Sequence, residues 1–251
     1  MKFARYQIGR RVAYGVVEGD TLRRMAGTPF GSHKFTGERD RVTDVRLLAP
    51  CKPTKMLAMA LNYKSHLGTA EPPKKPEPFW KALNSIAGPG DIIRLPADVG
   101  LVEEEAELVV VIGRKCQRVS KTEALSYVFG YTCGNDVSAR VWQRGDMQWW
   151  RAKSSDTFAA FGPVIVTDLD GANLDIRARV NGKEVQHCNT AELLYDIPTL
   201  VSFISQCVTL EPGDLIYTGT SGKPGEIRDG DSVEVEIQGI GVLRNPVKAV
   251  K

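Results

Sequence analysis

Residues 105–113 read Glu-Ala-Glu-Leu-Val-Val-Val-Ile-Gly, an acidic pair that runs directly into a β-branched apolar stretch. A short apolar run rich in valine is typical of a buried β-strand. Side chains alternate along a strand, so Glu105 and Glu107 are expected to face the same way, together with Glu103 if the strand begins early. Two carboxylates on one face repel each other, and a bound cation would relieve the repulsion. The spacing alone also allows a solvated acidic entrance to the strand.

Most of the remaining pattern predicts further strands. They are expected at residues 3–8, 11–17, 55–61, 158–166, 174–180, 214–218 and 233–237. Asn181-Gly182 is the strongest hairpin signal in the chain. Short helices are predicted at 120–127, opened by a Ser-x-x-Glu capping box, and from Asp196-Ile-Pro198 onward. Strand therefore exceeds helix, and the lack of regular βαβ alternation argues against a Rossmann sheet or a TIM barrel.

Composition excludes several classes of protein. The chain has 251 residues, of which 42% are hydrophobic and 25% charged, so it can bury a full core and is not a disordered or fibrous protein. The longest aliphatic stretch, 108–112, is far shorter than the about 20 residues of a membrane-spanning helix. Residues 1–11 lack the apolar segment of a signal peptide, and the five cysteines form no C-x-x-C pair. We therefore expect a reduced, cytoplasmic protein.

The chain also predicts an internal division. Residues 1–50 hold 10 Lys/Arg against 5 Asp/Glu, whereas the remainder holds 23 against 25. The basic charges are dispersed and match no nucleic-acid-binding motif, which favours a solvated small subdomain over a nucleic-acid partner. Residues 68–78 contain four prolines and almost no apolar residue, so a loop is expected there, of the kind that often serves as a lid.

A third acid strengthens the metal hypothesis. Asp136, in Gly-Asn-Asp-Val-Ser-Ala-Arg (134–140), lies where a strand is expected to meet a short helix at 137–143. On its own, Asp136 is equally compatible with the N-cap of that helix. Other chemical motifs are missing: the Gly219–Gly225 stretch lacks the Walker A spacing, and the three histidines are isolated in sequence.

Three motifs carry a resemblance to a known family. They are Glu-x-Glu-Leu at 105–108, Asn-Asp-x-Ser-Ala-Arg at 135–140 and Pro-Gly-Asp-x-Ile-x-Thr-Gly-Thr at 212–220. Together they resemble the fumarylacetoacetate hydrolase superfamily, in its single-domain acylpyruvase and isomerase branch. Similar segments cover nearly all of residues 51–251 in the expected order, and residues 1–50 resemble the variable N-terminal subdomain of many members.

The resemblance implies a fold and a metal site. The expected fold is mainly β (α+β), a mixed β-sandwich or roll with a few short helices. Residues 51–251 would form the catalytic domain, residues 1–50 a small N-terminal β subdomain, and the molecule a homodimer. Glu105, Glu107 and Asp136 fall on the family's three metal-ligand positions. Such an all-carboxylate site suits Mg²⁺ or Mn²⁺, with Ca²⁺ possible.

The resemblance also implies the remaining site residues. Lys153 and Gln143 match positions that bind substrate oxygens. Further pocket positions are matched by Lys81, Arg140 and Thr220. His66 matches the family's general base at the start of the lid. Hydrolytic relatives carry a glutamate three residues later, where this chain has Thr69, and Glu71 is the nearest acid able to replace it.

The function expected from these residues is divalent-metal-dependent C–C bond hydrolysis of an acylpyruvate-like 2,4-dioxo acid through an enolate. Because the lid glutamate is missing, the first alternative is an isomerase or decarboxylase that acts on a 2-hydroxy-diene-dioate of aromatic catabolism. A 2,4-diketo sugar-acid hydrolase and an inactive metal-binding homologue are further alternatives. The expected partners are a small 2-oxo acid and a second copy of the chain, with no nucleic acid and no membrane.

Overall fold

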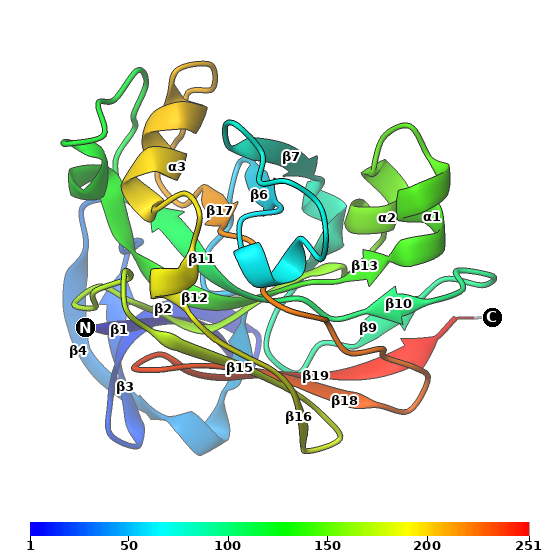
Figure 1. Ribbon diagram of the computed structural model, residues 1–251. Coiled ribbons are helices and arrows are strands. Elements are labelled where there is room, and N and C mark those ends of the chain that lie inside the picture. Colours follow the sequence, from blue (N-terminus) through cyan, green and yellow to red (C-terminus); the bar gives the residue numbers. More distant parts are fainter. Residues whose placement is uncertain (251) are drawn as a thin grey trace.

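The computed structural model describes residues 1–250, whose strands form two β layers and a short ribbon (Figure 1). The main sheet holds, in spatial order, β4 (Lys34–Arg41), β3 (Thr21–Ala26), β2 (Arg11–Glu18), β1 (Lys2–Ile8), β14 (Ala159–Val166), β12 (Val128–Asp136), β11 (Ala106–Ile112), β17 (Leu215–Tyr217), β6 (Met56–Ala60) and β7 (Glu77–Lys81). Two short strands join it at β1 and β14, namely β5 (Arg46–Leu48) and β8 (Ile86–Ala87).

The second sheet packs against the first. Its spatial order is β16 (Lys183–Asn189), β15 (Asp175–Val180), β18 (Ser232–Ile237), β19 (Gly241–Ala249) and β9 (Ile93–Leu95). The ribbon consists of β10 (Val102–Glu103) and β13 (Ser138–Ala139). Both sheets are mixed, since β6 and β17 pair in parallel, as do β9 and β19. The predicted mainly β architecture is confirmed.

Helices are short and lie at the margins of the sheets. The α-helices are α1 (Arg140–Gly145), α2 (Trp150–Ser154) and α3 (Ile197–Ser205). Single 3₁₀ turns are η1 (Val42–Asp44), η2 (Lys64–His66), η3 (Leu83–Ser85), η4 (Ala124–Tyr127) and η5 (Thr190–Glu192). Within residues 1–250, no helix combines the length and the apolar character needed to cross a bilayer.

Strand β11 is the centre of the main sheet. All seven of its residues are buried, and it pairs with β12 on one side and β17 on the other. Because both edges are occupied and both faces are covered, an unbroken valine-rich run is stable here. The interpretation of 105–113 as a buried strand is confirmed.

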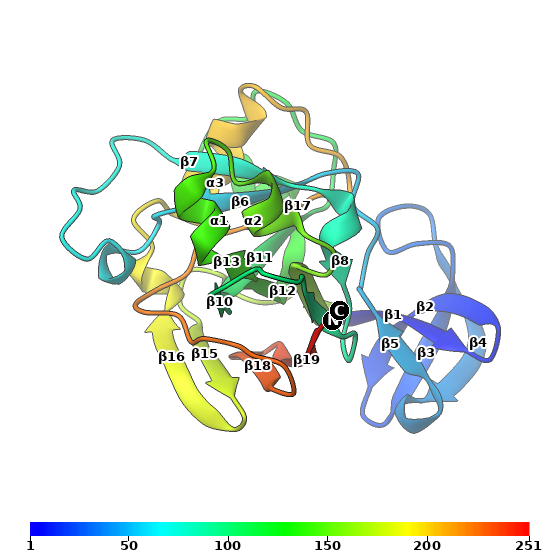
Figure 2. The ribbon, with the colours of Figure 1, turned by 90° about the vertical axis from the view of Figure 1, so that its right-hand side faces the viewer.

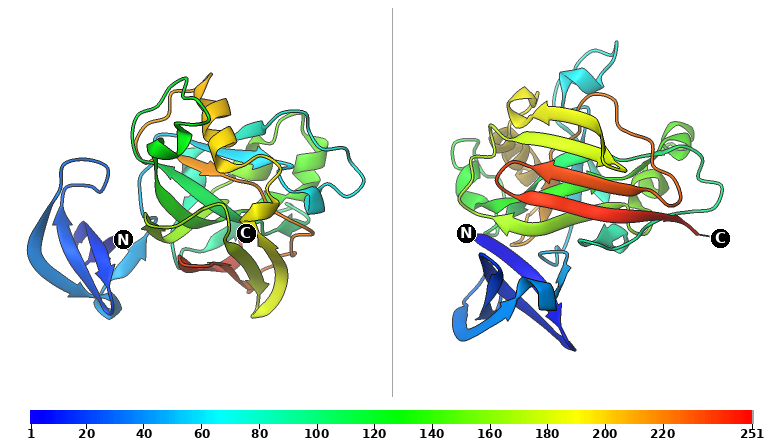
Figure 3. Two further views of the ribbon diagram at one scale, coloured as in Figure 1. Left: turned by 60° about the vertical axis from the view of Figure 1, so that its left-hand side comes forward. Right: turned by 90° about the horizontal axis from the view of Figure 1, so that it is seen from below.

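The first fifty residues extend this sheet as a projecting lobe (Figures 2 and 3). Lys2 and Phe3 of β1 pair with Val166 and Ile165 of β14, so the lobe is hydrogen-bonded to the rest of the sheet. Phe3 also packs against Phe129, with the ring centroids 5.2 Å apart. The division of the chain at residue 50 stays a prediction.

Of the four predictions that concern the hairpin turn and the helices, two are correct and two are wrong. Asn181 and Gly182 form the β15–β16 hairpin turn with positive φ at both positions, and Asp196 caps α3 by accepting from the amide of Thr199 at 3.0 Å. The predicted helix 120–127 is only the 3₁₀ turn η4, because Ser120 donates to the Glu123 side chain and no side chain caps the turn.

The predicted helix 137–143 is the second error. Ser138 and Ala139 are a strand that pairs with β10, and the amide of Arg140 donates to the Leu101 carbonyl at 2.8 Å. Since these backbone groups are bonded across the ribbon, the helix begins only at Arg140, and its N-cap residue is Ala139. Asp136 is therefore the last residue of β12 and caps no helix.

The central strand sets a stability prediction. Leu108 is fully buried in the main core, so Leu108→Ala should lower the free energy of unfolding by about 3 kcal/mol. Leu125→Ala is the matched control, because that leucine is 53% exposed. Urea unfolding of both variants measures the difference. Equal effects of the two substitutions would contradict the placement of β11 at the centre of the core.

Candidate active site

Three carboxylates meet at the ends of the two central strands. Glu107 lies on β11 and Asp136 ends β12, while the backbone carbonyl of Glu105 accepts from the amide of Asp136 at 2.9 Å. All three side chains are buried, and one carboxylate oxygen from each lies within 4.8 Å of the others. The antiparallel register therefore assembles the predicted acidic group, which could hold a metal ion.

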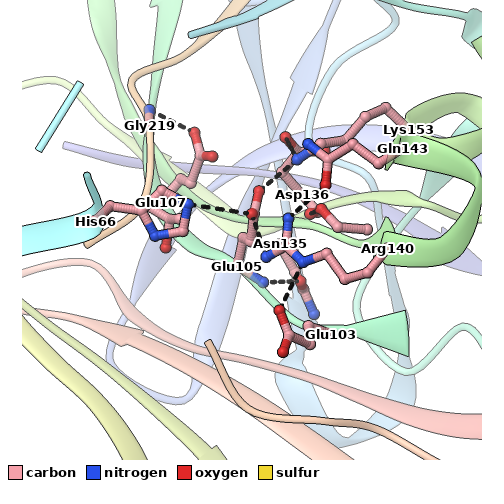
Figure 4. A network of polar contacts seen from close by, with 12 residues as sticks. His66, Glu103, Glu105, Glu107, Asn135, Asp136, Arg140, Gln143, Lys153 and Gly219 are labelled. Carbon is pink, nitrogen blue, oxygen red and sulfur yellow. Dashed lines mark hydrogen bonds and ion pairs between the residues drawn. The ribbon is translucent and has the colours of Figure 1, made fainter. Parts of the chain in front are cut away.

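Basic side chains surround these acids from three other elements (Figure 4). Lys153 on α2 donates to Glu105 and, at 2.8 Å, to Asp136, and Lys81 at the end of β7 donates to the second oxygen of Asp136. Arg140 on α1 donates to Glu105 at 2.7 Å. The two lysines and the arginine are buried as well, so they neutralise acids that would otherwise be uncompensated buried charges.

The surroundings shift the pKa values of Glu105, which directly precedes β11, and Glu107, which lies on it, in opposite directions. Burial alone would raise the pKa of Glu105, but Lys153 and Arg140 outweigh it and lower that pKa to about 2. For Glu107, burial together with the negative charges of Asp136 and Glu105 raises the pKa well above its usual value. The donor set is therefore short of positive charge on the Glu107 side, and a divalent cation fits that deficit.

The imidazole of His66 lies beside the same acids. Its Nε2 is 4.0 Å from Glu105, and its Nδ1 is 2.7 Å from the backbone carbonyl of Gly222. A carbonyl oxygen can only accept a hydrogen bond, so Nδ1 carries the proton. In the neutral ring, Nε2 is then an unprotonated acceptor directed at the site, as a general base requires.

The proposed lid partner of His66 is not in contact with it. Glu71 is exposed, and no ion pair joins it to His66 in the part of the chain that the structure describes. The backbone carbonyl of Gly222 instead fixes the tautomer of the ring. The contact with Gly222 could not be predicted, because a backbone carbonyl can come from any residue type and leaves no signal in the sequence.

Arg140 is engaged with protein groups on every side. Besides Glu105, it donates to Glu103 at 2.6 Å and to the amide oxygen of Gln143 at 2.8 Å. The contact to Gln143 leaves the amide nitrogen of that side chain as its free donor. The structure thus brings Arg140 and Gln143, two of the four predicted substrate-binding residues, together at the site, with Arg140 holding the carboxylate of Glu105 and the amide of Gln143.

Thr220 closes the site from the segment after β17. Its hydroxyl donates to the Ala106 carbonyl at 3.2 Å and accepts from the Gln186 amide at 3.0 Å. One residue earlier in the sequence, the amide of Gly219 donates to Glu107 at 2.7 Å. Gly219 has φ of +102°, and a Cβ there would lie 2.9 Å from the Cβ of Asn62, so a glycine is required at this position.

A small pocket opens over these residues. It has a volume of about 40 Å³, and its walls are Met59, Ala60, Leu61, His66, Phe79, Glu105, Gln143, Trp149, Lys153 and Thr220. A larger hollow of about 540 Å³, which Tyr131 and Ile197 help to line, shares no wall with it and none of the predicted site residues. The predicted site residues therefore line the small pocket and not this larger hollow.

Two protein-family models match the chain, one over its first fifty residues and one over most of the remainder. Residues 55–248 match the model of the fumarylacetoacetate (FAA) hydrolase C-terminal domain, and residues 1–50 match an N-terminal family described as Rv2993c-like. The chain belongs to the fumarylacetoacetate hydrolase family.

Individual relatives span different activities. Protein Rv2993c of Mycobacterium tuberculosis is 44% identical, with 98% of each chain covered. The mitochondrial oxaloacetate tautomerase Fahd2a of Rattus norvegicus is 41% identical, with 82% of this chain and 70% of the relative covered.

Solved structures are similar over the whole length. The 5-carboxymethyl-2-hydroxymuconate delta-isomerase of Mycobacterium smegmatis has a TM-score of 0.95 at 45% identity, with both chains covered completely. The maleylpyruvate hydrolase of Sphingobium sp. SYK-6, solved with manganese(II) and pyruvate, has a TM-score of 0.84 at 29% identity, again over both whole chains. Members of the family are thus isomerases, hydrolases and tautomerases.

The acidic group yields a binding prediction. Glu107→Gln should weaken Mg²⁺ binding at least about tenfold, because it removes a charge from the donor set. Glu71→Gln is the matched control, since it makes the same change on an exposed acid. Titration calorimetry measures both affinities. Wild-type affinity in Glu107→Gln would exclude this carboxylate as a ligand.

Proposed function

We propose that this protein is a metal-dependent enzyme that enolises a 2-oxo acid by proton transfer at C3, as in tautomerisation or isomerisation. The observation that carries the proposal is the position of His66, whose Nε2 lies 4.0 Å from Glu105, one of the three buried carboxylates. A base next to a metal-binding group is the minimum that such a reaction requires. Relatives named as a tautomerase and an isomerase support it.

The proposed metal ligands are Glu105, Glu107 and Asp136. A divalent cation held there would act as a Lewis acid on the ketone of the substrate. Their carboxylate oxygens are the donors that Mg²⁺ and Mn²⁺ prefer, and the manganese(II) in the maleylpyruvate hydrolase structure supports a metal of this kind.

Lys153 and Gln143 are the proposed oxygen-binding residues. Burial lowers the pKa of Lys153, but Asp136 and Glu105 outweigh this effect and raise it, so the side chain stays an ammonium. Because Lys153 lines the pocket, it supplies positive charge where negative charge develops on the substrate oxygen. The amide nitrogen of Gln143, oriented by Arg140, supplies a neutral donor in the same pocket. Lys81 supports both by holding Asp136.

His66 is the proposed base. Its Nε2 would accept the C3 proton and return it to another position, while the Gly222 carbonyl keeps Nδ1 protonated. Proton transfer at a carbon next to an activated ketone needs only a moderate base. Activation of water needs a base whose cationic form is stabilised, and the only carboxylate within 4.0 Å of His66 among residues 1–250 is the site's own Glu105. This difference favours proton transfer over hydrolysis.

Hydrolytic cleavage of an acylpyruvate is the second candidate. The maleylpyruvate hydrolase supports it, because that enzyme has the same fold over its whole length. In this case Glu71 would have to approach His66 when the lid closes. Magnesium as the metal, a homodimer, a cytoplasmic location and a separate N-terminal subdomain are further proposals that rest on the family resemblance.

The base is tested by proton exchange. In D₂O with Mg²⁺, His66→Ala should slow deuterium incorporation at C3 of a 2-oxo acid by a factor of about 10² to 10⁴, since it removes the only proposed base. Glu71→Gln should exchange within about twofold of the wild type. Proton NMR follows both reactions. A loss in Glu71→Gln as large as in His66→Ala would assign the base function to the pair and favour the hydrolase.

Lys153 gives a second kinetic test. Lys153→Met keeps the length of the side chain but removes the charge that stabilises the enolate, so kcat should fall by about 10² or more while KM changes less. Lys55→Met is the control, because neither Lys55 nor its ion-pair partner Asp214 lines this pocket. A raised KM with unchanged kcat would limit Lys153 to binding of the ground state.

A further inference from the structure

An aromatic hollow adjoins the catalytic pocket. It has a volume of about 420 Å³, and its walls are Ala60, Glu77, Pro78, Phe79, Trp80, Met147, Gln148, Trp149 and Trp150. We propose that it is the subsite for the non-reacting end of the substrate, and that this end is an uncharged apolar or aromatic group. The inference rests on the proposed function and adds a substrate class to it.

The hollow lies next to the site of chemistry. Ala60, Phe79 and Trp149 line both spaces. The ammonium of Lys153 lies 5.3 Å from the centre of the Phe79 ring, and Phe79 meets Trp149 edge to face with centroids 5.3 Å apart. A wall of aromatic rings therefore leads outward from the group that would bind the substrate oxygens.

The size of the inner pocket directs the substrate into this hollow. Its volume of about 40 Å³ is less than a tenth of the about 420 Å³ of the adjoining hollow. Only the oxygen-bearing head of a 2-oxo acid can approach the carboxylates and Lys153. Any group beyond C3 must lie outside the inner pocket. The hollow, which shares three lining residues with the inner pocket, is the adjacent space for such a group.

The charge of the hollow selects the chemistry of the tail. Among the residues that line it, the single charged side chain is the anionic Glu77. A distal carboxylate would meet aromatic rings and a like charge, and it would lose water without gaining a cation. An aromatic or aliphatic tail gains apolar contact there and loses little. The hollow therefore discriminates against the dicarboxylic acids.

The walls of the hollow expose an unusual amount of apolar surface. Trp80 is 56% exposed, Trp150 69% and Met147 fully exposed. Trp80 belongs to β7, while Met147 and Trp150 belong to the segment from α1 to α2, and Figure 2 shows these elements side by side. An exposed apolar surface next to a catalytic pocket marks a binding site, because it is shielded from water only when occupied.

Matched ligands test the inference without turnover. 2-Oxo-4-phenylbutanoate and 2-oxoglutarate are 2-oxobutanoate with a phenyl or a carboxylate group at C4. With Mg²⁺ present, titration calorimetry should show the phenyl compound binding about tenfold tighter than 2-oxobutanoate. The carboxylate compound should bind no tighter than 2-oxobutanoate. Equal or tighter binding of 2-oxoglutarate overturns the inference.

Variants locate the effect. Trp149→Ala and Met147→Ala should each reduce the preference for the phenyl tail, by about fivefold or more in Trp149→Ala, with binding of 2-oxobutanoate changed less. Phe35→Ala is the control, because this exposed aromatic residue lies on β4 in the N-terminal lobe. Sedimentation of the same variants tests the competing occupant. If Trp150→Ala dissociates an oligomer and the phenyl preference survives in all variants, the hollow is a contact between copies and the inference is wrong.

The outcome is separable from that of the proposed function. If C3 exchange fails for every 2-oxo acid while the phenyl compound still binds with its preference, the reaction is wrong and the subsite stands. If exchange proceeds but the tail preference is missing, the subsite is wrong and the reaction stands.

Discussion

The structure depends on the burial of three carboxylates at one point of a β-sheet. Removing an ion from water costs several kcal/mol even after relaxation, so Glu105, Glu107 and Asp136 are stable there only with compensating charge nearby. That charge comes from α2, β7 and α1, which contribute Lys153, Lys81 and Arg140. The short helices and β7 are therefore tied to the sheet by electrostatics as well as by packing.

This compensation relates stability to function. The two lysines supply two positive charges to the acidic group, which is the charge of one divalent cation. A bound cation would reduce the need for Lys153 to neutralise Asp136, and the ammonium would then be free to bind an oxygen of the substrate. Lys153 thus neutralises the buried acids when no cation is bound, and it is placed to bind the substrate when a cation is bound.

The acidic site was predictable because its geometry follows from local rules. Alternation along a strand places Glu105 and Glu107 together, and the β11–β12 register then brings Asp136 to them. The helix at 137–143 was mispredicted because its propensity is overridden by pairing with residues 102–103, more than thirty positions earlier. The role of Lys153 and Lys81 came from family resemblance, since lone lysines give no signal of their own.

The hydrogen-bond partner of His66 could not be predicted from the sequence. A charged side chain is visible in a sequence, and Glu71 is the acid nearest to His66 along the chain. The group that contacts Nδ1 in the structure is the Gly222 carbonyl, 156 positions away and independent of the side chain at that residue. A carbonyl fixes the tautomer of the ring but adds no full negative charge to stabilise its cation. Proteins of this fold are named as a hydrolase, an isomerase and a tautomerase, so the groups that face this imidazole, and not the fold, favour proton transfer here.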